Sequence, residues 1–197
     1  MKFNSFFIPV FFILFILIFS LSTFIPALSE YGYVSSYYPN NYTNSINISS
    51  SNFIWPAPGY NKITSYFGYR NAPTSGAGTY HGGIDIAAPT GSNIIACSSG
   101  IVTFADFYGA NGFTVKIENG NLTFLYSHVS PAFLVHVGQY INKGEVIAKV
   151  GPKNVYNVPN NPYKDSNGNP TNGATTGAHL HFAIRKDGQA VNPLNYF

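Results

Sequence analysis

The chain beyond residue 52 alternates apolar and polar residues in short runs, which are separated by turns containing glycine, proline and asparagine. Short runs rich in valine, isoleucine, phenylalanine and tyrosine are typical of β-strands. We expect strands at Ile63–Phe67, Gly83–Ile86, Ile101–Ala105, Phe113–Ile117, Leu122–Tyr126, Val146–Val150 and Leu180–Arg185. Because no capped segment of helical period follows residue 30, the pattern predicts an all-β domain at residues 53–197, built on a twisted antiparallel sheet.

The N-terminal part has a different pattern. Lys2 is followed by an uncharged run rich in phenylalanine, isoleucine and leucine that ends at Ser29. A secretory signal has such a basic start and apolar centre, but the run also approaches the ~20 residues that span a bilayer. We therefore expect residues 1–29 to be a signal peptide or a membrane anchor, and residues 30–52 to be a flexible linker. The domain is then extracytoplasmic, either secreted or anchored to the membrane by its N-terminus.

Charge and cysteine content limit the partners and the chemistry. The formal net charge of +3 suits an anionic wall or membrane surface, and no cluster of lysine and arginine indicates nucleic-acid binding. Cys97 is the only cysteine, which excludes an internal disulfide. Because it ends the apolar run Ile94–Cys97, we expect it to be a buried core residue rather than a nucleophile.

Four of the five histidines lie in three short motifs. The first motif joins His81 to Asp85 through two glycines, whose backbone freedom allows the imidazole and the carboxylate to meet. The second contains His128. The third is His179-Leu-His181, in which both histidines share one face of a strand. A catalytic zinc site needs three nitrogen or carboxylate ligands and an open position, so the first motif and one histidine of the third could supply it.

Together these motifs resemble the lysostaphin-type zinc endopeptidases, which cut peptide bonds in bacterial cell walls. The resemblance runs from Ile63 to Phe197. It includes Thr-Ser-Tyr-Phe-Gly-Tyr-Arg70, the motif from His81 to Asp85, Val137-Gly-Gln-Tyr-Ile-Asn-Lys-Gly144 and Thr176-Gly-Ala-His-Leu-His-Phe, all in the order of the family. It implies the lysostaphin-type fold, with long loops that form a groove.

The resemblance also implies the roles of the histidines. His81, Asp85 and His181 would bind one zinc ion per chain, and His128 and His179 would be the catalytic histidines that do not bind the metal. The implied activity is that of a zinc metalloendopeptidase, which hydrolyses peptide bonds in peptidoglycan stem peptides or cross-bridges with a metal-bound water.

The segment Pro152–Thr176 is long for a loop in a compact domain. The family usually connects the flanking motifs with only a few residues, so we interpret the segment as an insertion. Its asparagine and glycine content predicts a mobile surface loop beside the third motif. We expect Tyr156 and Tyr163 in this loop, together with Arg70 and Tyr80 near the first motif, to bind substrate.

Two other functions are compatible with parts of the sequence. The residues from Val137 to Ala148 look like a hairpin of a biotinyl- or lipoyl-carrier domain, but carriers need an attachment lysine that is typically beside methionine, and Met1 is the only methionine. The second alternative is a catalytically silent family member that acts as a wall-binding or partner-binding scaffold. Such members lose zinc ligands, whereas this chain keeps all of them, so catalysis is favoured.

Overall fold

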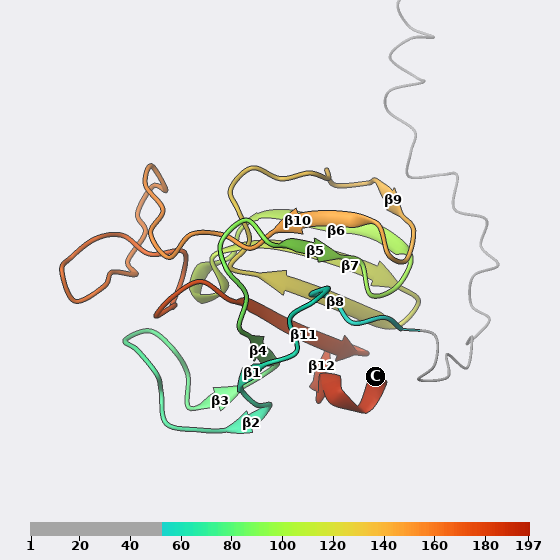
Figure 1. Ribbon diagram of the computed structural model, residues 1–197, viewed down its shortest axis with the longest axis horizontal. Coiled ribbons are helices and arrows are strands. Elements are labelled where there is room, and N and C mark those ends of the chain that lie inside the picture. The colour runs from blue at the N-terminus through green and yellow to red at the C-terminus, as the bar shows by residue number, and fades with distance from the viewer. Residues whose placement is uncertain (1–52) are drawn as a thin grey trace, which may run out of the picture. The chain divides into compact units, whose positions relative to one another are not determined.

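The computed structural model describes residues 53–197, and the predicted signal or anchor and the predicted linker lie outside this range. The described part consists of strands and two short 3-10 helices, at Gly109–Asn111 and Pro193–Tyr196, which confirms the predicted all-β class (Figure 1). None of its helices has the length and apolar character that crossing a membrane requires.

Most strands belong to one antiparallel sheet. Its order is β1 (Ile63–Ser65), β4 (Ile84–Ile86), β11 (Leu180–Lys186), β8 (Leu122–Ser127), β7 (Phe113–Asn119), β6 (Gly100–Phe107) and β9 (Tyr140–Ile141), with β12 (Gln189–Val191) paired to β11. Two antiparallel ribbons complete the fold: β2 (Gly68–Tyr69) with β3 (Tyr80–His81), and β5 (Asn93–Ile95) with β10 (Val146–Lys149). Each predicted run overlaps an observed strand. The strands that were not predicted are two or three residues long, too short to show a period.

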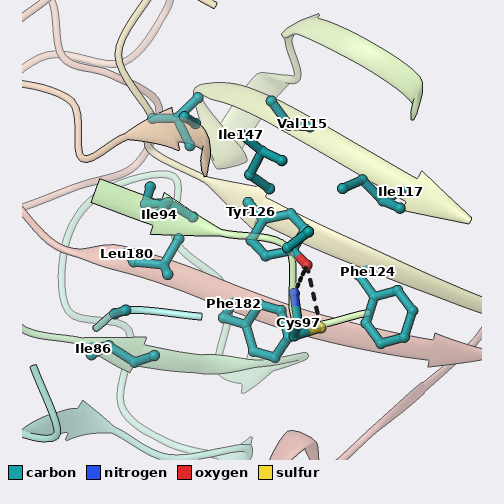
Figure 2. Packing of buried hydrophobic residues seen from close by; sticks show 14 of the residues in the cluster. Ile86, Ile94, Cys97, Val115, Ile117, Phe124, Tyr126, Ile147, Leu180 and Phe182 are labelled. Atoms are coloured by element: carbon teal, nitrogen blue, oxygen red, sulfur yellow. Dashed lines mark hydrogen bonds between the residues drawn. The ribbon is translucent and has the colours of Figure 1, made fainter. Parts of the chain in front are cut away.

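The core lies on one face of the main sheet. Along β11, Leu180, Phe182 and Ile184 are wholly buried, as strand alternation requires. The β5–β10 ribbon contributes Ile94 and Ile147 to the same cluster (Figure 2).

Cys97 lies within this core, as predicted. Its backbone N–H donates to the Tyr126 hydroxyl at 2.9 Å, and that hydroxyl donates to Cys97 Sγ at 3.2 Å (Figure 2). Burial raises the pKa of the thiol to about 12, so the thiol stays protonated at neutral pH and is not a nucleophile.

The other face of the sheet carries the histidine motifs. His181 of β11 lies opposite Asp85 of β4 on one side and opposite Ser127 of β8 on the other. The strand register therefore brings the first and third motifs together, although they are about one hundred residues apart in the sequence.

The segment Pro152–Thr176 projects beyond the sheet in Figure 1, where it is drawn in orange. It is only partly the surface loop that its composition predicts. Val155 and Thr171 are buried, and Asn172 is wholly buried. The last residues of the segment therefore belong to the body of the domain, because their polar groups find partners there.

Candidate metal centre and its histidines

The three predicted metal ligands converge on one point. His81 Nε2 lies 3.1 Å from Asp85 Oδ1 and 2.9 Å from His181 Nδ1, and the last two atoms are 2.8 Å apart. The Gly82–Gly83 bend makes this possible, because a Cβ at Gly83 would lie 2.4 Å from the Phe182 carbonyl oxygen. Only glycine allows the chain to pass so close to β11.

This donor set fits zinc. Ligand atoms at about 2.0–2.1 Å from a tetrahedral zinc are about 3.3 Å from one another, close to the separations of these three atoms. Two imidazole nitrogens and one carboxylate oxygen are also the ligand types of several catalytic zinc sites. Among residues 53–197, His81, Asp85 and His181 form the group of side chains that could hold a metal ion.

Neighbouring groups fix the orientation of the ligands. Arg70 Nη1 donates to Asp85 Oδ2 at 3.1 Å and also contacts the Ser65 hydroxyl, which leaves Asp85 Oδ1 facing the other two donors. Arg70 was predicted to bind substrate. Its observed contact is with a predicted metal ligand, and partners of this kind orient ligands and strengthen metal binding.

The other predicted histidines lie beside the ligand set. The rings of His128 and His179 have centroids 4.7 Å apart, and His179 Nε2 is 3.5 Å from Asp85 Oδ1. Both residues line the same cleft as the three ligands, with a volume of about 650 Å³.

Backbone carbonyl groups determine the tautomers of three of these rings. The carbonyl of Tyr66 accepts a hydrogen bond from His81 Nδ1 at 2.8 Å. In the same way, the Asn172 backbone carbonyl accepts from His128 Nδ1 at 2.6 Å, and the Gly177 backbone carbonyl accepts from His179 Nδ1 at 2.9 Å. Because a carbonyl oxygen only accepts, Nδ1 carries the hydrogen in each ring. Each neutral ring therefore presents an unprotonated Nε2.

The protonation states suit metal binding. Burial raises the pKa of Asp85, but the close contacts of its carboxylate with the imidazoles, that of His179 first, lower it by more, so the carboxylate is ionised. Burial lowers the pKa of His181 despite its contact with Asp85, and this ring is neutral. Burial also lowers the pKa of His128, and the imidazoles of His179 and His181 beside it disfavour its protonation further. A metal requires such an ionised carboxylate and unprotonated nitrogens.

His128 adopts an unusual backbone conformation. Its φ is +58°, in the left-handed region, which costs a non-glycine residue about 1–2 kcal/mol. The surrounding chain enforces this conformation: His128 N–H donates to Asn111, its carbonyl accepts from Gly151, and its ring is held by Asn172. Strained residues of this kind occur frequently at functional sites.

Asn172 ties the end of the Pro152–Thr176 segment to the site. Its side-chain oxygen accepts from Phe113 N–H at 2.8 Å, and its side-chain nitrogen donates to the Val129 carbonyl at 2.9 Å. These two bonds fix the backbone carbonyl that holds His128.

Two of the four predicted substrate-binding residues lie in the cleft, and two lie outside its lining. Arg70 and Tyr80 line the cleft, whereas Tyr156 and Tyr163 are not among its described lining residues. Tyr156 is exposed, and the Tyr163 ring packs against Gly76. Substrate contact by the four residues stays a prediction.

Sequence reasoning missed several residues of the site. The carbonyl groups of Tyr66, Asn172 and Gly177 have no sequence signature, because every residue has a carbonyl. Arg185, which also lines the cleft, could have been found, since it lies an even number of residues from His181 in a predicted strand.

Comparison with known proteins identifies a family. Residues 79–193 match the model described as Peptidase family M23. The chain is 36% identical over 137 residues to the DD-carboxypeptidase/endopeptidase Mpg of Neisseria meningitidis serogroup B, covering 69% of this chain and 27% of Mpg. It is 30% identical over 165 residues to the murein hydrolase activator NlpD of Salmonella typhimurium, covering 83% of this chain and 36% of NlpD. The chain thus spans only about a quarter to a third of these relatives.

Solved structures are similar as well. A zinc containing peptidase from Vibrio cholerae has a TM-score of 0.55 and 27% identity, covering 70% of this chain and 37% of that chain. The catalytic domain of the antimicrobial peptidase lysostaphin from Staphylococcus simulans has a TM-score of 0.54 and 23% identity, covering 75% of this chain and 93% of that chain. The second match confirms the predicted lysostaphin-type fold.

Proposed function

The chain belongs to peptidase family M23, and on that premise we propose that it is a zinc-dependent endopeptidase acting on peptide bonds of peptidoglycan stem peptides or cross-bridges. The observation that carries the proposal is the convergence of donor atoms from His81, Asp85 and His181, with two further imidazoles beside them in one cleft. Binding to a wall or a partner does not require this arrangement.

The ligand residues would hold one zinc ion per chain through His81 Nε2, Asp85 Oδ1 and His181 Nδ1. Zinc bound there supplies a Lewis acid and lowers the pKa of water to about 7. The chain contributes the orientation of these atoms, because Arg70 holds Asp85 and the Tyr66 carbonyl holds the His81 ring.

His128 and His179 would transfer the protons. An unprotonated Nε2 can accept a proton from the water that attacks the peptide carbonyl, and the resulting imidazolium can donate to the oxyanion or to the leaving amine. Burial keeps His128 neutral, which suits this ring for accepting the proton.

The proposed substrate requires an extracytoplasmic location. Peptidoglycan lies outside the cytoplasmic membrane, and the apolar run after Lys2 supports export or anchoring of the domain. Protease treatment of intact protoplasts tests the location: the domain should be digested without lysis, and protection until lysis would contradict export.

Hydrolysis is tested with the full chain purified in detergent and incubated with purified peptidoglycan, with mass spectrometry of the fragments. We expect His128→Ala and His179→Ala to retain zinc but to lose hydrolysis by about 10²–10⁴-fold, because each removes a proton-transfer group. His136→Ala is the matched control, since His136 is exposed and is not among the lining residues of the cleft.

Two outcomes would refute parts of the proposal. Near-normal turnover in both variants with zinc bound would exclude the assigned catalytic histidines. No hydrolysis by the zinc-loaded parent would favour the scaffold function. In that case the name of the relative NlpD, a murein hydrolase activator, suggests the next measurement, which is stimulation of a separately added murein hydrolase.

A further inference from the structure

Arg185 lies on the face of β11 that carries the metal centre. Leu180, Phe182 and Ile184 point into the core, so the alternate residues of the strand face the cleft. Arg185 is exposed and lines this cleft. It follows His181 by four residues, which at about 3.3 Å per residue separates the two backbones by about 13 Å.

The floor of the cleft between His181 and Arg185 consists mainly of small residues. Gly82, Ala183 and Ala190 line the cleft there. Ala190 pairs with Arg185 across β12 and β11, and a Cβ added at Gly82 would lie 3.7 Å from the Ala190 Cβ. Leu125 pairs with Ala183 and also lines the cleft, but it is buried. An extended peptide can therefore lie from the metal centre to Arg185 over alanine and glycine, with Leu125 beside it.

The charges in the cleft are unbalanced. Asp85 is the one acidic residue among its described lining residues, and it is already shared by the imidazoles and Arg70. The Arg185 guanidinium takes part in none of the ion pairs of residues 53–197. A divalent cation at the metal centre would increase the positive charge further, and such a cleft attracts anions.

The acidic residues closest to Arg185 in the sheet have other partners. Asp187 accepts from Asn121 Nδ2 at 3.2 and 3.1 Å. Glu118 lies in the same cross-strand row as Arg185 but two strands away, and it accepts from Thr103 at 3.2 Å. The guanidinium of Arg185 is therefore available to a ligand.

We propose that Arg185 binds a carboxylate of the substrate, so that the cleft selects anionic peptides over neutral ones. This inference rests on the proposed endopeptidase function and names its substrate class: peptidoglycan peptides with a free carboxylate about four residues from the scissile bond, the distance that an extended peptide covers in 13 Å. A guanidinium matches a carboxylate through two parallel hydrogen bonds, which the ammonium group of lysine cannot form.

The test uses purified cross-linked muropeptide dimers with free carboxylates, and the same dimers after amidation with carbodiimide and ammonia. The parent and Arg185→Ala, Arg185→Lys and Lys186→Ala variants of the full chain are compared for kcat and KM. Lys186→Ala is the matched control, because it removes an equal charge from the adjacent residue, which faces the opposite side of β11.

The parent should prefer the free dimers about tenfold or more, mainly through a lower KM, as a charge-assisted pair provides. Arg185→Ala should raise KM for the free dimers by a similar factor and leave the amidated dimers unchanged. Arg185→Lys should restore part of the preference, and Lys186→Ala should match the parent.

Equal turnover of the two dimers by the parent would overturn the carboxylate site and leave the endopeptidase function intact. An equal effect of Arg185→Ala on both dimers would do the same. If the parent cuts neither dimer, the proposed function fails. Calorimetry of binding of the two dimers to the parent then tests whether Arg185 binds a carboxylate. Equal Kd values for the free and amidated dimers would overturn the site.

Discussion

Replacement of Asn172 by alanine should weaken both the fold and the catalytic arrangement. The asparagine side chain is wholly buried and makes two hydrogen bonds, one to Phe113 N–H and one to the Val129 carbonyl. Alanine leaves both backbone groups without these partners. The carbonyl that holds the His128 ring belongs to the same residue, so its position becomes less fixed.

The expected loss of folding stability follows from the two lost hydrogen bonds. A buried polar group left without a partner costs about 1–3 kcal/mol, so the pair costs about 2–6 kcal/mol. A water molecule that enters the space left by the amide brings the cost to the lower limit. For a domain of this size, about 2–4 °C of Tm is lost per kcal/mol, which predicts a decrease of about 4–24 °C.

Thermal unfolding followed by circular dichroism measures this decrease. Ser166→Ala, an exposed position in the same segment, is the control and should change stability by less than about 0.5 kcal/mol. Elemental analysis should find zinc retained in Asn172→Ala, because the ligands are elsewhere, while hydrolysis of peptidoglycan decreases. A Tm within 1 °C of the parent together with full activity would refute the reasoning.

Asp85→Ala removes one donor atom, and we expect elemental analysis to find much less zinc per chain than in the parent or in His136→Ala; full occupancy would contradict the ligand assignment. Arg70→Ala should lower zinc affinity about 10–100-fold, as measured by competition with a chelator, because Asp85 loses its orienting partner; unchanged affinity would exclude that role. Burial raises the pKa of Asp165, but hydrogen bonds from Asn154 and from backbone N–H groups lower it from 3.8 to about 2. Because the folded pKa lies below the unfolded one, this stabilisation is present above about pH 4 and is lost as the pH falls towards 2. The Tm difference between the parent and Asp165→Asn should therefore shrink over this range, and a constant difference would contradict it.

The long strands were predictable because they alternate over enough residues to show a period. β11 is the clearest case, since its even-numbered apolar residues enter the core and its odd-numbered residues face the cleft. The ribbon of β2 and β3 was not predictable, because a strand of two residues has no period. Its two strands are recognised only in the folded chain, where Gly68 pairs with His81 and Tyr69 pairs with Tyr80.

The candidate site was predictable only where side chains carry the chemistry. The motifs predicted His81, Asp85 and one histidine of the third motif as the donor set, and only the family resemblance chose His181; the sheet register explains why these side chains meet. The role of Asn172 was not predictable, because the segment around it is rich in asparagine and glycine, which indicated a surface loop. An asparagine can be buried when its amide satisfies backbone groups on other segments, and those groups are invisible in the sequence.

The carbonyl groups that hold His81, His128 and His179 have a consequence for how this site can diverge. Every residue has a carbonyl, so a substitution at Tyr66 or Gly177 changes the side chain without removing the hydrogen-bond acceptor. The position of the hydrogen on each ring depends on the path of the backbone, and sequences can drift at these positions while the tautomers persist. Conversely, an insertion or deletion that displaces one of these loops can change a tautomer while every histidine is kept.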